Sequence, residues 1–108
     1  MKFKTLLVEI SEGVAEVTLN RPDAANAMDP IMSKELSDLA IECDTNPEVR
    51  AVLITGAGKM FCAGGDLKGF AEEDNISGAL LSMAGDLHMG LSRFARMSAP
   101  VILSLIHI

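Results

Sequence analysis

A glycine-dense loop is the part of this sequence best suited to chemistry. Five glycines fall within residues 56–69, directly after an apolar run. Because glycine has no Cβ, main chain in such a loop can approach a ligand closely, and successive amides can converge on one negative oxygen. Asp66 can cap a helical turn there and place the Gly64 and Gly65 amides near a positive dipole end. Loop chemistry alone supports a ligand site and a plain connection equally.

Two common glycine motifs do not fit this loop. A P-loop requires Gly-x-x-x-x-Gly-Lys-Ser/Thr, but Met60 follows Gly58-Lys59, and Leu53 stands where the first glycine belongs. A dinucleotide-binding fingerprint requires a third glycine where this sequence has Phe61. The loop is therefore neither a nucleoside-triphosphate loop nor a Rossmann turn.

Two motifs together resemble the enoyl-CoA hydratase/isomerase superfamily, the crotonases. Residues 20–28, Asn-Arg-Pro-Asp-Ala-Ala-Asn-Ala-Met, are similar to the NRP-x-x-x-NA-L signature of that family. Residues 56–67, Gly-Ala-Gly-Lys-Met-Phe-Cys-Ala-Gly-Gly-Asp-Leu, are similar to its G-x-G-x-x-F-x-A-G-A/G-D-L loop. The motifs occur in the order of the family, and the resemblance covers residues 1–102.

The resemblance implies an acyl-CoA site. In crotonases the amide at the position of Gly65 is one of two oxyanion-hole donors, and the carbonyl at Ala63 usually accepts from the adenine amino group of coenzyme A. The position of Ala25 commonly lies along the pyrophosphate or pantetheine. Asp66 and Leu67, beside Gly64, shape the loop around the thioester. On charge alone, Arg21, Lys59 and Lys68 are candidates to meet the phosphates of coenzyme A.

The resemblance also implies the reaction. Crotonase reactions pass through a thioester enolate, and fixed amides stabilise the charge that grows on its oxygen. Hydration of a 2-enoyl-CoA is expected first and double-bond isomerisation next; dehalogenation, decarboxylation, hydrolysis and Dieckmann-type ring closure use the same scaffold. Coenzyme A would be part of the substrate, with no permanently bound cofactor and no metal. Crotonases usually form homotrimers or hexamers.

Beyond residue 102 the sequence departs from the family. Crotonases continue with a small-residue strand and a glycine-rich helix start, which carry the second oxyanion amide and, in hydratases, a catalytic glutamate. Here residues 103–108 read Leu-Ser-Leu-Ile-His-Ile. We expect residues 1–102 to be the N-terminal portion of a crotonase-like domain, and 103–108 to be an atypical tail from a truncated reading frame. A catalytically inert, CoA-binding fragment is therefore the alternative to an enzyme.

The remaining reactive side chains are better explained by structure than by catalysis. Cys62 has no evident histidine partner and is expected to be a small buried thiol. His88 stands beside an apolar stripe, where a partly solvated structural role is expected, and His107 in the tail carries no functional weight. Residues 72–74, Glu-Glu-Asp, are expected to be a solvated loop.

Apolar periodicity predicts the elements that hold the two motifs. Alternation through residues 5–10 and 15–20, around a Ser-Glu-Gly turn, predicts a β-hairpin that Pro22 terminates. A helix is predicted to begin after the N-cap Asp29 and to end near Asn46, with Ser33 on its wet side. Its apolar stripe comprises Met32, Leu36, Leu39, Ala40 and Cys43.

The second half continues the alternation of strand and helix. Residues 51–55 are a nearly unbroken apolar run, which predicts a strand buried on both faces. Residues 77–97 predict a helix and residues 101–106 another strand. The apolar stripe of this helix comprises Leu80, Ala84, Leu87, Leu91 and Phe94. This order predicts an α/β protein, and the resemblance specifies the crotonase-like ββα-spiral, truncated after the first part of its core.

Composition excludes several other classes of protein. With 108 residues, 49% hydrophobic and 22% charged, the chain suits one globular domain. A net charge of −6 without a basic cluster argues against a nucleic acid or an anionic membrane as partner. Two cysteines without CxxC spacing predict neither a disulfide framework nor a zinc site. No secretory signal or membrane-spanning run is evident, so the cytoplasm is the default location.

Overall fold

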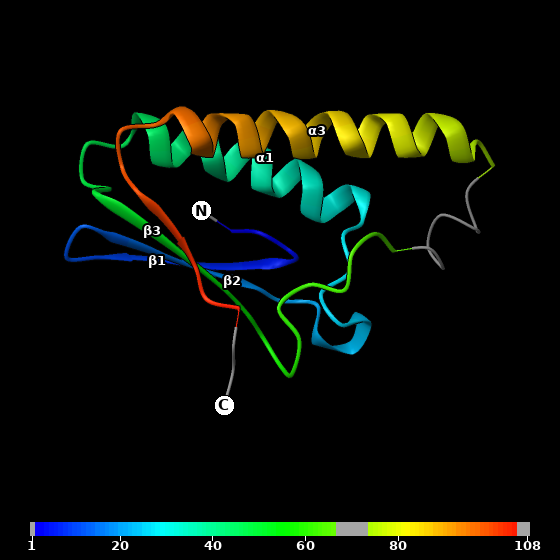
Figure 1. Cartoon of the computed structure of the whole chain (residues 1–108), viewed down its shortest axis with the longest axis horizontal. Helices are drawn as coiled ribbons and strands as arrows, with labels where there is room; N and C mark the ends of the chain where they lie inside the picture. Colours follow the sequence, from blue (N-terminus) through cyan, green and yellow to red (C-terminus); the bar gives the residue numbers. More distant parts are fainter. Residues whose placement is uncertain (1, 67–73, 106–108) are drawn as a thin grey trace.

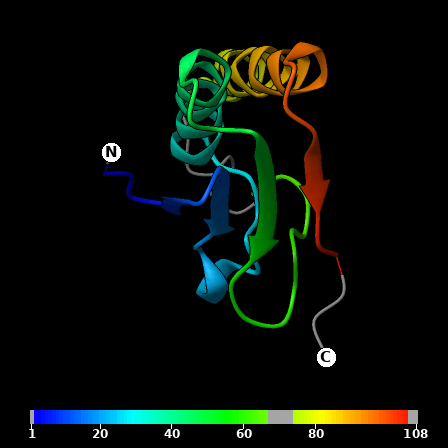
Figure 2. The same ribbon diagram turned by 90° about the vertical axis from the view of Figure 1, so that its left-hand side faces the viewer.

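The computed structural model describes residues 2–66 and 74–105, and it arranges them in two layers (Figures 1 and 2). A four-stranded sheet in the order β1-β2-β3-β4 forms one layer. Two long helices lie side by side across one face of this sheet. The elements in chain order are β1 (Leu6–Ser11), β2 (Val14–Leu19), the 3-10 turn η1 (Pro22–Ala24), α1 (Pro30–Thr45), β3 (Ala51–Gly56), α3 (Ile76–Arg96) and β4 (Val101–Leu103). The predicted α/β class and order are confirmed.

The predicted hairpin is the antiparallel pair β1 and β2. Its two-residue turn places Glu12 at φ 54° and Gly13 at φ 86°, the left-handed backbone whose twist matches that of the flanking strands. Ser11 pairs with Val14 and Leu6 with Leu19. This register turns Ala15, Val17 and Leu19 toward the helices, where all three are buried.

The strands β2, β3 and β4 run parallel, and a helix connects each successive pair. Parallel strands joined by helices place the carboxyl ends of the strands beside the amino ends of the helices that follow. The connections after β2 and β3, which carry the two motifs, therefore emerge at the same end of the sheet (Figure 1). This topology brings distant parts of the sequence together.

Helix α1 follows the sequence prediction closely. The Asp29 side chain accepts a hydrogen bond from the Met32 amide at 2.8 Å, as an N-cap residue does. All five residues of the predicted apolar stripe are buried. The placement of Ser33 on the wet side is wrong: this residue is completely buried, because α1 is covered by the sheet and also by α3.

Helix α3 spans nearly the predicted residues, but a different face of it is buried. Met83, Gly90 and Phe94 are buried, whereas Leu80 and Leu91 of the predicted stripe are 40% and 52% exposed. At Gly90 the helix approaches the backbone of α1 so closely that an added Cβ would lie 3.1 Å from the Ser37 Cα. The contact face is therefore rotated toward α1.

Two strand predictions need correction. Ala51, Leu53 and Thr55 of β3 are only half-buried, because the helices cover one face of the sheet and not both. Strand β4 ends at Leu103, earlier than predicted, although the Ser104 amide still donates to the Ile54 carbonyl at 2.9 Å. Residues 106–108 lie outside the described part of the chain.

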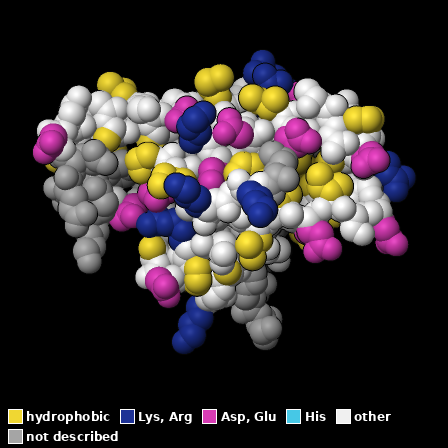
Figure 3. Space-filling model, turned by 180° about the vertical axis from the view of Figure 1, so that it is seen from behind, with side chains coloured by type: hydrophobic (Ala, Val, Ile, Leu, Met, Phe, Trp, Pro, Cys, Tyr) yellow, Lys and Arg dark blue, Asp and Glu magenta, His cyan; other side chains and the backbone are white. Residues whose placement is uncertain are grey.

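Charged side chains of both signs are interspersed on the face of the molecule seen in Figure 3. Among the described residues, no helix combines the length and the apolar composition needed to cross a membrane.

Candidate functional site

The two motifs meet in a short parallel bridge between Met28 and Gly65. The Met28 amide donates to the Gly64 carbonyl at 2.6 Å, and the Asp66 amide donates to the Met28 carbonyl at 2.8 Å. A further hydrogen bond of 3.1 Å runs from the Ala63 amide to the Ala25 carbonyl. The structure thus brings together five residues singled out from the sequence: Ala25, Ala63, Gly64, Gly65 and Asp66.

The bridge decides where the Gly65 amide points. Met28 bonds to the residues on either side of Gly65, so the N–H and carbonyl of Gly65 itself point away from Met28. Within the described part of the chain, the Gly65 amide donates to no protein acceptor. Gly65 is exposed, and an amide that has no partner among the described residues is available to an external oxygen.

Gly64 supplies the turn that orients this amide. Its φ of 103° is a backbone conformation that L side chains rarely adopt. A Cβ added there would meet nothing within 4 Å, so the requirement for glycine is conformational and not steric. Open space therefore adjoins Gly64, which has no side chain to fill it.

Asn26 is a structural centre of the site that the sequence interpretation missed. It is completely buried, and its Nδ2 donates to the carbonyls of Ala57 at 2.8 Å and Met60 at 2.7 Å. Its Oδ1 accepts from the Arg21 amide at 2.7 Å. Asn26 also has a φ of 54°, which asparagine tolerates better than most residues. The asparagine of the first motif therefore joins its own loop to the glycine loop.

Arg21 also contacts the protein itself. Its Nη2 donates to Asp66 Oδ2 at 3.0 Å, and its Nε lies 3.6 Å from Asp29 Oδ2. Its Nη1 donates to the Ala27 carbonyl. These contacts give Arg21 an internal role, and its contact with a phosphate of coenzyme A stays a prediction. The opposite charges of Arg21 and Asp66 could have suggested this ion pair, but their spacing in the sequence does not reveal that the two side chains are in contact.

An apolar pocket of about 180 Å³ adjoins the bridge. Its lining includes Met28, which bonds to both neighbours of Gly65, and Cys62, whose thiol lies 3.9 Å from the Gly64 carbonyl. The complete lining is Leu19, Met28, Leu36, Ile54, Phe61, Cys62, Leu87, Leu91, Phe94 and Leu103. Because no charged side chain is among these described residues, the pocket suits a hydrocarbon group.

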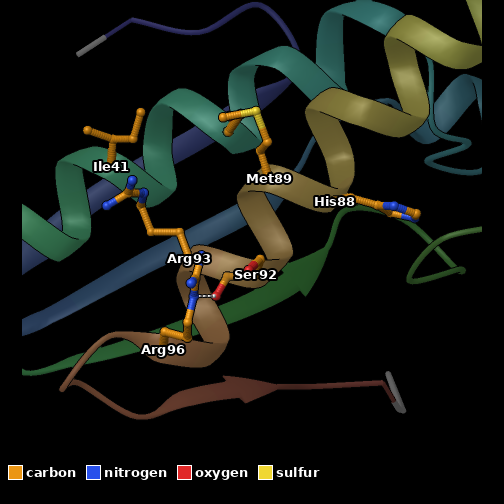
Figure 4. A pocket seen from close by; sticks show the side chains of 7 residues that line it. Ile41, His88, Met89, Ser92, Arg93 and Arg96 are labelled. Atoms are coloured by element: carbon orange, nitrogen blue, oxygen red, sulfur yellow. Dashed lines mark hydrogen bonds between the residues drawn. The ribbon is translucent and has the colours of Figure 1, made fainter.

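A second pocket, of about 230 Å³, lies between α1 and α3 toward the carboxyl end of α3 (Figure 4). It is lined by Ser37, Ile41, His88, Met89, Ser92, Arg93 and Arg96. Arg93 already pairs with Asp44 at 3.0 Å, and His88 extends away from the two arginines in Figure 4. This pocket does not adjoin either motif, so the apolar pocket is the better candidate.

The other reactive residues fall into separate environments. Cys62 is half-buried and not fully buried as predicted, whereas Cys43 is buried. Burial, with a smaller contribution from Glu42, raises the pKa of the Cys43 thiol to about 11. His88 and Asp74 are exposed. Leu67, Lys68, Glu72, Glu73 and His107 lie outside the described residues.

Among the described residues, no three His, Cys, Asp or Glu side chains gather closely enough to hold a metal ion.

The sheet, its helical layer and the bridged motif loops define the class as crotonase-like. A family profile described as "Enoyl-CoA hydratase/isomerase" matches residues 9–105. The chain belongs to the enoyl-CoA hydratase/isomerase family.

Similar proteins support the same membership. The chain is 46% identical over 71 residues to the protein named "Probable enoyl-CoA hydratase echA8" of Mycobacterium leprae, covering 66% of this chain and 28% of that protein. It is 40% identical over 72 residues to a hydroxycinnamoyl-CoA hydratase-lyase of Pseudomonas fluorescens, covering 67% and 26%. The chain thus spans between a quarter and a third of the length of these curated relatives.

Solved structures show the same fold. An enoyl-CoA hydratase of Mycobacterium smegmatis superposes with a TM-score of 0.81 at 34% identity, over 94% of this chain and 40% of that one. An enoyl-CoA hydratase/isomerase of Xanthobacter autotrophicus Py2 gives 0.82 at 31% identity, over 97% and 39%. The predicted crotonase fold class is confirmed.

Proposed function

We propose that this chain binds an acyl-CoA thioester and that the Gly65 amide donates a hydrogen bond to the thioester oxygen. The observation that carries the proposal is the amide of the exposed Gly65, which is unpaired among the described residues and belongs to a bridge whose partner, Met28, lines an apolar pocket. In this proposal the Gly65 amide donates to the thioester oxygen, and the apolar pocket holds the hydrocarbon part of the acyl group.

The chemistry of such a site is polarisation of the thioester. As the carbonyl becomes an enolate, negative charge grows on its oxygen, and a fixed amide stabilises that charge more than it stabilises the ground state. Removal of one such donor costs about 2.7–4 kcal/mol of barrier, or roughly 100- to 1000-fold in rate. In hydration of a 2-enoyl-CoA, the water oxygen bonds to C3 and a proton is added at C2 of that enolate.

The coenzyme A part of the substrate is expected to lie along the two bridged loops. We infer that the Ala63 carbonyl accepts from the adenine amino group and that Ala25 lies beside the pantetheine or pyrophosphate. Ala63 is exposed and its amide is held by the Ala25 carbonyl at 3.1 Å, so the two positions are adjacent. Lys59, also exposed, remains the candidate for a phosphate.

The size of the pocket agrees with a short or cyclic hydrocarbon group. Its volume of about 180 Å³ compares with the roughly 150 Å³ cavity that accepts benzene in an engineered protein core. Two relatives are named for hydration of CoA thioesters with aromatic acyl groups: the hydroxycinnamoyl-CoA hydratase-lyase and an (E)-benzylidenesuccinyl-CoA hydratase of Thauera aromatica. Hydration is therefore the reaction that we propose, ahead of isomerisation.

Binding without turnover is the second candidate, and the lining of the pocket favours it for this chain alone. Hydration needs groups that deliver and remove protons. The described residues that line the pocket include no Asp, Glu or His. On this view the chain supplies binding and one oxyanion donor, and turnover requires carboxylates from elsewhere.

Calorimetric titration of acetoacetyl-CoA, an enolisable analogue, tests the proposal. Gly65→Pro removes the proposed donor, and we expect binding to weaken at least about tenfold, since one hydrogen bond of about 1.4 kcal/mol corresponds to that factor. Ile76→Pro is the matched control, because it places proline at the first position of α3, where an amide has no partner within the helix.

The two variants must retain the circular dichroism of the parent chain. Equal affinity in the parent and in Gly65→Pro would exclude the Gly65 amide as the donor. A folded, monodisperse parent chain that binds no acetoacetyl-CoA would contradict an acyl-CoA site within this chain.

A further inference from the structure

The loop that carries the Gly65 amide has little packing of its own. Gly64 and Gly65 are exposed, and a Cβ added at Gly64 would find no atom within 4 Å. Two adjacent glycines also have more backbone freedom than any other pair of residues. A donor that must be fixed before the reaction begins is therefore held by contacts from outside its loop.

One such contact comes from the side chain of Arg21. Its Nη2 donates to Asp66 Oδ2 at 3.0 Å, and Asp66 directly follows Gly65. The Arg21 and Asp66 side chains are only 20% and 19% exposed, so water screens this pair less than a pair on the open surface. The contact spans 45 positions of sequence and joins the first motif to the second.

Arg21 is itself held in place by its surroundings. Its amide donates to Asn26 Oδ1 at 2.7 Å. The other two guanidinium nitrogens face the Ala27 carbonyl and, at 3.6 Å, Asp29 Oδ2 at the amino end of α1. A planar guanidinium with all three nitrogens engaged has little rotational freedom left. It therefore connects the glycine loop to the rigid start of a helix.

We propose that Arg21 is a positioning residue for the oxyanion donor. Its ion pair with Asp66 fixes the peptide between Gly65 and Asp66, and with the Met28 bridge it sets the direction of the Gly65 amide. The inference rests on the proposed function only for the identity of Gly65 as the donor. The restraint of Gly65 by Arg21 can be tested on the chain without any ligand.

The proposal distinguishes Arg21 from a ligand of the coenzyme. A residue that orients the donor to the thioester oxygen affects acetoacetyl-CoA more than free coenzyme A, because free coenzyme A has no thioester carbonyl. A residue that binds a phosphate affects both ligands equally. The ratio of the two affinities therefore distinguishes positioning of the Gly65 amide from binding of a phosphate. A general loss of stability would lower both affinities and would leave this ratio unchanged.

The test uses the 108-residue chain with the variants Arg21→Gln and Asp66→Asn. Arg50→Gln is the matched control, since Arg50 is exposed at the hairpin end of the sheet and its Nη2 makes only a long contact of 3.4 Å with the Glu12 carbonyl. Nitrogen-15 relaxation reports the order parameter of the Gly65 amide, and calorimetry reports the affinities for acetoacetyl-CoA and for free coenzyme A.

We expect the order parameter of Gly65 to fall from about 0.85, typical of rigid backbone, to below about 0.6 in Arg21→Gln and in Asp66→Asn. Acetoacetyl-CoA should bind about tenfold more weakly to both variants, and the affinity for free coenzyme A should fall less. The effects of the two substitutions should not add in the double variant, because both break the same ion pair. Arg50→Gln should match the parent chain.

Two results would overturn the proposal. Equal weakening of both ligands in Arg21→Gln would make Arg21 a phosphate ligand, and an unchanged order parameter at Gly65 would exclude the restraint. If Arg21→Gln fails to fold, Asp66→Asn decides alone, because it leaves the contacts of Arg21 with Ala27 and Asp29 in place. If the parent chain binds neither ligand, the proposed function fails, and the order parameters still decide whether Arg21 restrains Gly65.

Discussion

At the level of single residues, the candidate site is held together by the side chains of Asn26 and Arg21. Their hydrogen bonds and ion pairs join the first motif to the glycine loop that carries Gly65. Catalysis by a backbone amide has this consequence in general: the reacting group is identical in every residue, so its performance depends on what orients it. The informative mutations are therefore at the supporting residues.

Asn26→Asp is expected to destabilise the chain by about 3 kcal/mol or more. Aspartate has nearly the same shape but cannot donate when ionised, so it would face the Ala57 and Met60 carbonyls as a buried anion. Urea unfolding at neutral pH measures the loss. Asn46→Asp is the matched control, because the Asn46 side chain only accepts, from the Glu48 amide at 2.9 Å. A loss below about 0.5 kcal/mol, typical of surface substitutions, would contradict the structural role of Asn26.

At the level of elements, the contact between α1 and α3 depends on one glycine. Gly90 faces the backbone of α1 at Leu36 and Ser37, and both helices together cover the sheet. Close approach at this point rotates α3 so that its buried face includes Met83, while Leu80 and Leu91 remain outside. The apolar stripe of α3 is thus divided between the core and the wall of the apolar pocket.

Gly90→Leu should lower the free energy of unfolding by about 2 kcal/mol or more, because the added side chain forces apart two backbones that cannot both relax. Gly85→Leu in the same helix should raise it by about 0.5–1 kcal/mol, since a Cβ there meets nothing within 4 Å and leucine favours a helix over glycine. Thermal and urea unfolding of both variants test the pair. Equal effects at the two positions would show that α3 does not pack closely on α1.

At the level of the whole molecule, apolar surface remains uncovered on the side of α3 and β4. Leu91 and Leu103 line the apolar pocket and yet are 52% and 51% exposed, and Ile102 and Leu105 are 55% and 61% exposed. Exposed patches of this kind on a soluble chain favour association. The exposed apolar residues around this pocket are therefore expected to favour association between copies of the chain.

We expect the chain to self-associate at micromolar concentration and the double substitution Leu91→Glu with Leu103→Glu to reduce that association. The reason is electrostatic, since two added carboxylates make burial of this surface costly. Sedimentation velocity over a concentration series measures it. Ser82→Glu, an exposed position of α3, adds charge without removing apolar surface and should leave association unchanged. A parent chain that stays monomeric throughout would contradict this reading of the surface.

The sequence by itself determined the elements and the family. Strand-period alternation, the Asp29 cap and the apolar stripe of α1 predicted their elements nearly to the residue, because these signals depend on neighbours in sequence. The two motifs identified the family and the loop that carries Gly65. These inferences needed no knowledge of which segments pack together.

Only the tertiary structure decided which faces and which partners those elements have. The half-buried face of β3, the burial of Ser33 and the rotation of α3 depend on where the second layer lies, and no local pattern records that. The pairing of Arg21 with Asp66 and the three hydrogen bonds of Asn26 join the two motifs at the carboxyl ends of the parallel strands β2 and β3. Their physical cause is topology, because parallel strands bring both loops to the same edge.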